Sequence, residues 1–186
     1  MTDSKQPQGT GALAGLLVLD FGQGVSAPHC ARLFADYGAD VIKIEPRHGD
    51  AARSSGPYPG DQPHPERSGL FFFHNTNKRG VTCDVSHTEG RALFLDLVRR
   101  ADVLIENNLP AQMREWGIDY PTLAAINPNL VMISITPFGQ TGPYSEWHGQ
   151  DLNAYHLSGA SARYCGRPRE MPLEHGTFSA DYFGSV

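Results

Sequence analysis

The sequence lacks the features that mark secreted, membrane-spanning and nucleic-acid-binding proteins. Its three cysteines are odd in number and show no C-x-x-C spacing, so we expect no disulfide framework and a reducing, cytoplasmic setting. No apolar run is long enough to span a bilayer. The formal net charge of −5 gives no broad basic field for nucleic acid or an anionic membrane. We therefore expect a soluble protein with no nucleic-acid and no membrane partner.

Metal-binding and hydrolase motifs are also missing. The histidines never fall in an H-E-x-x-H pattern, and no acidic pattern completes a site beside His148 or His156. Neither a G-x-S-x-G elbow nor a P-loop is present. We predict no metal, and the motifs of serine hydrolases and P-loop enzymes are not found.

What the sequence does have is a regular alternation of apolar runs and helical patterns. Near-continuous apolar runs, typical of parallel strands covered on both faces, lie at 16–21, 41–45, 102–106 and 130–135. Helical patterns between these runs lie at 28–38, 86–100 and 121–126. The alternation predicts an α/β fold, a Rossmann-like, mostly parallel doubly wound sheet with flanking helices.

Three segments carry more specific expectations. The polar leader, residues 1–14, is expected to be disordered, and the proline-rich stretch 46–68 is expected to be a long surface loop. The helix over 86–100 should start at a capping box formed by Ser86 and Glu89. The side chains that this helix is expected to bury are Leu93, Phe94, Leu97 and Val98.

A glycine pair follows the first predicted strand and opens a helix. The spacing Gly22-x-Gly24-x-x-Ala27, with the acidic Glu45 at the end of the next strand, is the one that dinucleotide-binding folds use. Taken alone it suggests an NAD-dependent enzyme. A turn in an ordinary strand-to-helix junction explains it about as well.

Basic and amide side chains stand at other predicted loops. Lys78 and Arg79 are adjacent and could hold phosphates, although a solvated basic turn is the better explanation on composition alone. Asn107 and Asn108 follow a predicted strand, at the edge where ligands gather in open α/β sheets. Turn formation before a proline explains these asparagines equally well.

Two further stretches could reach a ligand. The turn-rich segment 136–144 follows the last predicted strand and could stack Phe138 or Tyr144 on a base, or it could be a plain loop. Asp181 lies beside aromatic residues, and an aspartate can act as a nucleophile toward a thioester. Without further information, capping of a following helix is the simpler role for Asp181.

Taken together and in order, these pieces resemble the family III CoA-transferases, also called the CaiB/BaiF family. The resemblance covers nearly the whole chain from residue 15 onward. The matching stretches are LLVLDFGQGVSAP, LFADYGADVIKIEPRHGD, NTNKRGVTCDVSHTEGRALFLDLVRRADVLIEN, INPNLVMISITPFGQTGPY, QDLNAYHLSG and SADYFGS.

The resemblance implies a function and a site. It implies a Rossmann-like large domain that binds coenzyme A instead of NAD, with Asp181 as the nucleophile of a transfer of CoA from an acyl-CoA to a carboxylic acid. The two basic residues Lys78 and Arg79 would support the cleft. The CoA contacts implied by motif position are Gly24, Val25, Ser26, Cys83 to Ser86, Asn107, Asn108, Arg114 and Thr136 to Phe138.

The chain also departs from the family's patterns. Pro46 stands where many members carry an arginine, and Glu115 stands at a second such place, which puts adenine and phosphate contacts there in doubt. Gln150 replaces the histidine of the racemase branch, and glutamine cannot exchange a proton near neutral pH. A 2-methylacyl-CoA racemase, an NAD-binding oxidoreductase and a non-catalytic CoA-binding module remain the alternative functions.

The resemblance further implies that more chain is needed for a whole enzyme. Residues 15–186 would form the N-terminal part of the large domain, without the family's small domain and C-terminal return. Members of the family are interlocked homodimers, so the full-length protein is expected to be one. We expect that these residues alone are a truncated product with little transferase activity.

Overall fold

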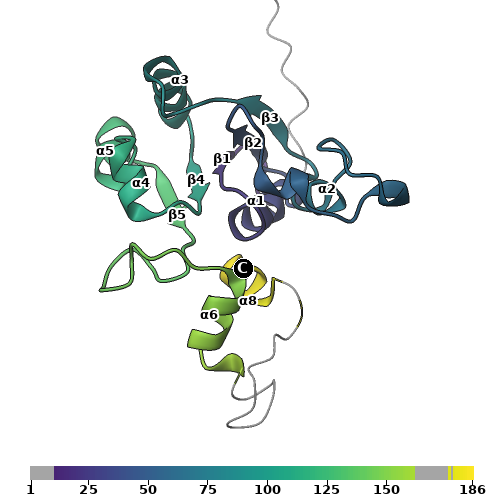
Figure 1. Cartoon of the computed structure of the whole chain (residues 1–186). Helices are drawn as coiled ribbons and strands as arrows, with labels where there is room; N and C mark the ends of the chain where they lie inside the picture. Colours follow the sequence, from purple (N-terminus) through teal and green to yellow (C-terminus); the bar gives the residue numbers. More distant parts are fainter. Residues whose placement is uncertain (1–10, 162–175, 177) are drawn as a thin grey trace, which may run out of the picture.

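The computed structural model describes residues 11–161, 176 and 178–186. Its centre is a five-stranded sheet with strand order β3-β2-β1-β4-β5, in which every neighbouring pair is parallel (Figure 1). The strands are β1 (Leu17–Phe21), β2 (Asp40–Glu45), β3 (Arg79–Thr82), β4 (Val103–Glu106) and β5 (Val131–Ser134). This confirms the α/β, Rossmann-like fold class. The four predicted strands are β1, β2, β4 and β5.

Helices cover both faces of the sheet because alternate strand residues point to opposite sides. On one face, Val18 packs in a core with the alanine stripe of α1 (Ser26–Asp36), where Ala27 and Ala31 are fully buried. On the other face, Leu19 packs in a second core with Phe94 and other apolar side chains. The helices that contribute to this second core are α3 (Thr88–Val98), α4 (Pro110–Glu115) and α5 (Tyr120–Ile126).

The expected loop over 46–68 contains only two short 3-10 turns, η1 (Ala51–Ser54) and η2 (Pro59–Asp61). It leads into α2 (Gly69–Asn75), a helix that the sequence patterns did not indicate. Residues 1–10 of the expected disordered leader lie outside the described residues. The expectation is wrong for residues 11–14, which form a turn: Leu13 N–H donates to Tyr37 O at 3.0 Å.

The start of α3 also differs from its prediction. Ser86 does not cap the helix, because its hydroxyl bonds to Asp84 Oδ1 at 2.6 Å and His87 is the N-cap residue. Phe94 is fully buried as expected, but Leu93 is 61% exposed. A shift of one residue moves a side chain by about 100° around a helix, so neighbouring leucine and phenylalanine cannot both face the core.

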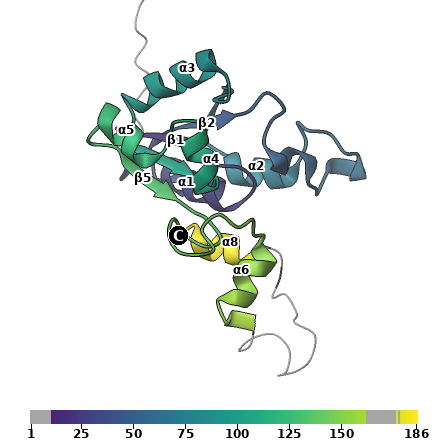
Figure 2. The ribbon, with the colours of Figure 1, turned by 60° about the vertical axis from the view of Figure 1, so that its left-hand side comes forward.

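Two helices lie away from the sheet and its covering helices. Figures 1 and 2 show α6 (Asp151–Leu157) and α8 (Ser179–Gly184) side by side, reached by the chain after β5. Within residues 11–161, 176 and 178–186, no helix is long and apolar enough to cross a bilayer.

The contrast between Phe94 and Leu93 gives a test of the fold. Replacing Phe94 by Ala removes a ring that packs 5.0 Å from the Phe21 ring in the second core, and should lower the free energy of unfolding by about 3–5 kcal/mol. Leu93→Ala, on the same helix, should change it by less than about 0.5 kcal/mol. Urea unfolding of both variants measures this difference. If both substitutions lowered the free energy of unfolding equally, Phe94 would not be on the buried face of α3 with Leu93 on the exposed face.

Candidate active site

A cavity of about 1020 Å³ lies where the carboxyl ends of the strands meet α6 and α8. Its sheet side is formed by residues that directly follow strands, such as Asn107 after β4 and Thr136 after β5. Ser26, the first residue of α1, also lines it. Residues on the side of α6 and α8 include His148, Gln150, Asp151, Tyr155 and Asp181. The cavity is therefore placed where parallel α/β sheets bind ligands.

Asp181 lies in the first turn of α8 and faces this cavity. The cap of α8 is Phe178, which has φ +62°, so Asp181 is not the helix cap that its sequence context suggested. Burial raises the pKa of Asp181, the nearby carboxylate of Asp151 raises it further, and a hydrogen bond from Ser26 opposes both. A half-buried carboxylate in an open cavity can reach a ligand and still ionise.

Asp151 is an acidic neighbour of Asp181. It is the first residue of α6, and its Oδ1 accepts the Asp181 N–H at 2.8 Å. Its Oδ2 is buried without a hydrogen-bond partner among the described residues. Gln150 caps α6 in a reciprocal capping box with Asn153, which fixes the direction in which Asp151 leaves the helix. The Asp151 carboxylate on α6 is thus bound to the backbone of Asp181 on α8.

Two polar contacts to histidines and a set of ring contacts hold α8 against α1 and α2. His29 Nδ1 on α1 lies 2.7 Å from Ser185 Oγ, and His74 Nε2 on α2 lies 3.3 Å from Tyr182 Oη. The rings of His29 and Tyr182 meet edge to face with centroids 5.0 Å apart. Because Tyr182 directly follows Asp181, these contacts hold the carboxylate at its place in the cavity.

The glycine pair of the β1–α1 junction has an unexpected arrangement. The three successive N–H groups all donate to side chains: Gly22 to Asp20 at 3.0 Å, Gln23 to Asn107 at 2.9 Å and Gly24 to Asp50 at 2.9 Å. These donors are therefore not available to a pyrophosphate. A Cβ on Gly22 would lie 2.3 Å from the Ala27 Cβ, whereas Gly24 has φ +74° and open space on that side.

The structure brings some of the site residues implied by the resemblance together and separates others. Ser26, Asn107, Thr136 and Asp181 line the cavity, and Gly24 and Val25 belong to the adjoining loop. Asn108 supports this edge, with its Nδ2 donating to Phe21 O at 3.3 Å.

The remaining implied residues do not line the cavity. Cys83 is buried, with Sγ 3.1 Å from Gly90 O, and Ser86 is exposed after β3. Phe138 packs against Tyr144 and Trp147 in the loop before α6. Arg114 is exposed and pairs with Glu146.

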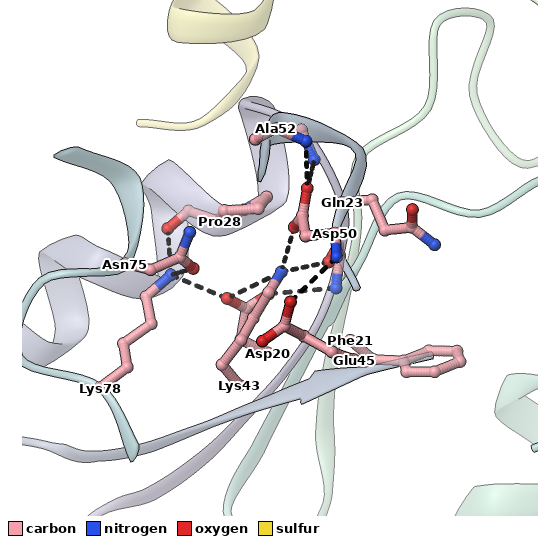
Figure 3. A network of polar contacts seen from close by, with 12 residues as sticks. Asp20, Phe21, Gln23, Pro28, Lys43, Glu45, Asp50, Ala52, Asn75 and Lys78 are labelled. Atoms are coloured by element: carbon pink, nitrogen blue, oxygen red, sulfur yellow. Dashed lines mark hydrogen bonds and ion pairs between the residues drawn. The ribbon is translucent and has the colours of Figure 1, made fainter. Parts of the chain in front are cut away.

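Neither Lys78 nor Arg79 is placed as a phosphate ligand would be. Lys78 is buried and donates to Asp20 Oδ2 at 2.7 Å, Pro28 O at 2.7 Å and Asn75 Oδ1 at 3.0 Å, so all three of its protons are used within the protein (Figure 3). Burial lowers the pKa of Lys78 to about 8. Arg79 begins β3, at the opposite edge of the sheet from the cavity, and pairs with Asp40. Lys78 supports the site from behind, and Arg79 does not approach it.

Several side chains that shape the site were not predicted. Asp151 sits in the stretch QDLNAYHLSG, where the comparison with racemases drew attention to Gln150 instead. No sequence motif indicated a role for His29, His74 or Asp50, because these residues lie in separate segments that only the fold brings together. Among the described residues, no group of three or more histidine, cysteine or acidic side chains could hold a metal ion.

The chain has clear relatives among characterised proteins. A family model described as CoA-transferase family III matches residues 13–186. The chain belongs to the CoA-transferase family III. It is 38% identical to the succinate–glutarate CoA-transferase of Agrobacterium fabrum, over 100% of this chain and 46% of that protein. It is 40% identical to the acetyl-CoA:oxalate CoA-transferase of Acetobacter aceti, over 100% of this chain and 47% of that protein.

Solved structures of the same family agree. A CaiB/BaiF family protein from Brucella suis superposes with a TM-score of 0.82 at 37% identity, over 92% of this chain and 45% of that chain. The chain thus spans a little under half of the length of these relatives. The family III assignment agrees with the sequence resemblance and with the sheet order, and the family is one of enzymes.

The buried histidine behind α8 gives a pH-dependent prediction. Burial, followed by the charges of His29, Lys78 and Arg32, lowers the pKa of His74 from 6.5 to about 4, with Asp50 opposing. Because the unfolded state then binds the proton more readily, His74 contributes stability above about pH 6.5 that is lost as the pH falls toward 4.

Urea unfolding at pH 7 and pH 5 measures this effect. His74→Gln should reduce the loss of stability between the two pH values, because glutamine does not titrate. His48→Gln, at an exposed site, should leave the difference as in the wild type. An unchanged pH dependence in His74→Gln would refute a neutral buried His74.

Proposed function

We propose that the protein containing these residues transfers CoA from an acyl-CoA thioester to a carboxylic acid, with Asp181 as the covalent nucleophile. The observation that carries the proposal is the position of Asp181 in the cavity, beside Asp151 and the start of α1. The relatives are named for transfers of this kind between CoA esters and carboxylic acids, and they support the substrate class.

The proposed transfer proceeds in four steps, each a nucleophilic substitution at a carbonyl carbon. The Asp181 carboxylate attacks the thioester of the donor and expels CoA thiolate, which leaves a mixed anhydride. The thiolate then attacks the Asp181 carbonyl and releases the donor's carboxylate, forming an aspartyl-CoA thioester. The acceptor carboxylate attacks this thioester and again expels the thiolate. Finally the thiolate attacks the acceptor's acyl carbon, which forms the new acyl-CoA and frees Asp181.

The environment of Asp181 suits this sequence of reactions. Each step builds negative charge on a carbonyl oxygen, and the start of α1 lies at the cavity with the Ser26 side chain within reach of Asp181. A helix N-terminus favours negative charge by roughly 0.3–1 kcal/mol at exposed positions and more in buried ones. The neighbouring Asp151 carboxylate disfavours a negative charge on Asp181, and so raises the energy of the free Asp181 carboxylate relative to its uncharged anhydride and thioester.

We propose that coenzyme A binds as substrate along the carboxyl edge of the sheet, without a metal and without NAD. Gly24, whose open side has room for a ligand, would be approached directly, together with Val25, Ser26, Asn107 and Thr136. Asn108 would contribute from behind. The residues implied by motif position that lie outside the cavity, namely Cys83, Ser86, Arg114 and Phe138, would contact more distant parts of CoA.

The organisation of the whole protein is part of this proposal. Residues 15–186 would form the N-terminal part of a CoA-binding large domain, and the protein would work in the cytoplasm as an interlocked homodimer. Leu157 and Phe183, which are 72% and 78% exposed on α6 and α8, are apolar side chains that such an assembly would cover. A racemase is disfavoured because Gln150, which lines the cavity, cannot exchange protons near neutral pH.

The nucleophile is tested by trapping. Incubation of the complete protein with acyl-CoA and hydroxylamine should convert Asp181 into its hydroxamate, detected by mass spectrometry of the peptide. Asp181→Ala should abolish trapping and lower kcat by at least about a thousandfold. Asp96→Ala, which removes an exposed carboxylate on α3, should leave both unchanged. Full turnover in Asp181→Ala would disprove the mechanism.

The role of Asp151 predicts a change in pH dependence. Asp151→Asn removes the negative charge that raises the pKa of Asp181, so that pKa falls. Asp181 must be ionised to attack, and the acidic limb of the kcat/KM profile should therefore move to lower pH. Profiles of wild type and Asp151→Asn are compared under identical salt. A limb that stays in place or moves upward would contradict the coupling of the two carboxylates.

A further inference from the structure

Four charged side chains are buried together behind the glycine loop at the carboxyl ends of β1 and β2 (Figure 3). Lys43 Nζ lies 2.7 Å from Asp50 Oδ2 and 3.6 Å from Asp20 Oδ2, and Lys78 Nζ lies 2.7 Å from Asp20 Oδ2. Burial acts to raise the pKa of Asp20, but Lys43 and Lys78 together hold it below its ordinary value. Two ammonium groups thus face two carboxylates, and the buried group is formally neutral.

The network reaches the backbone of the loop at three points. Gly22 N–H donates to Asp20, Gly22 O accepts from Lys43 Nζ, and Gly24 N–H donates to Asp50 Oδ1. Asp20 belongs to β1 and Lys43 to β2, whereas Asp50, which binds Gly24, lies in neither strand. The Asp50 contact fixes the residue whose φ is +74° and whose open side has no heavy atom within 4 Å of the place that a Cβ would take. Gly24 lies two residues before Ser26, which lines the cavity.

Asp50 in turn is held by the long loop over 46–68. Its Oδ1 also accepts the Ala52 N–H at 2.8 Å and caps η1, and its own N–H donates to Glu45 Oε1 at 2.9 Å. Arg53 grips the same Glu45 with two hydrogen bonds, of 2.7 and 2.8 Å. The position of Asp50 is therefore set by the start of this loop, and Asp50 transmits it to Gly24.

A purely stabilising role explains this arrangement poorly. Burying charges is costly, and apolar side chains of similar volume often stabilise a protein as well or better. The Asp50 carboxylate gives the loop something that an apolar side chain cannot, an acceptor for the Gly24 N–H. This contact fixes the orientation of the Gly24 N–H, while the side of Gly24 where a Cβ would stand is open.

We propose that Asp50 is a positioning residue, which holds Gly24 in the conformation that the coenzyme A site needs, and that Lys43 keeps Asp50 ionised and in place. The inference rests on the proposed function, because it assumes that Gly24 borders the bound CoA. According to this inference, the loop over 46–68 contributes to CoA affinity through Asp50, although Asp50 does not line the cavity.

Two double variants test the hydrogen bond from the Gly24 N–H to Asp50. Removing Asp50 alone would leave the two buried ammonium groups of Lys43 and Lys78 with a single carboxylate, Asp20, and is expected to destabilise the fold. Lys43→Met with Asp50→Asn, and Lys43→Met with Asp50→Ala, both remove one charge of each sign. They differ from each other in whether an acceptor remains at residue 50 for the Gly24 N–H. Asp40→Asn serves as the control, since it breaks the exposed Arg79–Asp40 pair at the other end of β2.

Affinity for coenzyme A is measured by titration calorimetry on the complete protein, with circular dichroism to verify folding. The variant with alanine should bind CoA at least about tenfold more weakly than the variant with asparagine. Asp40→Asn should bind as the wild type does. Trapping of Asp181 by hydroxylamine at saturating acyl-CoA should proceed in both double variants, because the nucleophile is untouched.

The outcomes separate the two proposals. If the wild type binds CoA and the two double variants bind it equally well, the positioning role of Asp50 is overturned and the transferase proposal stands. If the wild type neither binds CoA nor is trapped, the transferase proposal fails and this inference fails with it. A tenfold difference between the double variants, with equal circular dichroism, supports the inference.

Discussion

The Lys43 ammonium is enclosed at the end of β2, and the surrounding structure is arranged to satisfy it. Two carboxylates and the carbonyl of Gly22 surround it, and these come from β1, from the β1–α1 loop and from the start of the long loop. A buried charge that loses a partner costs several kcal/mol, so these segments cannot move independently. The shape of the glycine loop, and with it the sheet side of the cavity, follows from this requirement.

The opposite side of the cavity depends on weaker contacts. Helix α8 is short and is held to α1 and α2 by two hydrogen bonds and by ring contacts around His29, His74 and Tyr182. A helix of six residues has little stability of its own, so its position comes from these contacts and from α6. The proposed nucleophile is therefore on α8, whose position depends on packing, and it lies opposite the β1–α1 loop, whose position depends on buried charged side chains.

The sequence patterns predicted the sheet well because both of its faces are covered. Buried parallel strands need near-continuous apolar runs, and those runs located β1, β2, β4 and β5 to within one residue at each end. Strand β3 is at the edge with all four residues exposed, so it carries no such run. Helices α4 and α6 are too short for a clear helical period. Along α3, the pattern alone did not decide that Phe94, and not Leu93, faces the core.

The site was predictable only in part. By itself the sequence determined the family, the parallel sheet and the stretch that contains Asp181, because these depend on local order and on motifs in sequence. Tertiary structure alone decided the partners: Asp50 at Gly24, Asn107 at Gln23 and Asp151 at Asp181. These pairs are separated by 26, 84 and 30 residues along the chain, and contacts over such separations leave no periodic trace. For the same reason the sequence could not show that Lys78, a possible phosphate ligand or a solvated basic residue by its pattern, donates all its hydrogen bonds to groups within the protein.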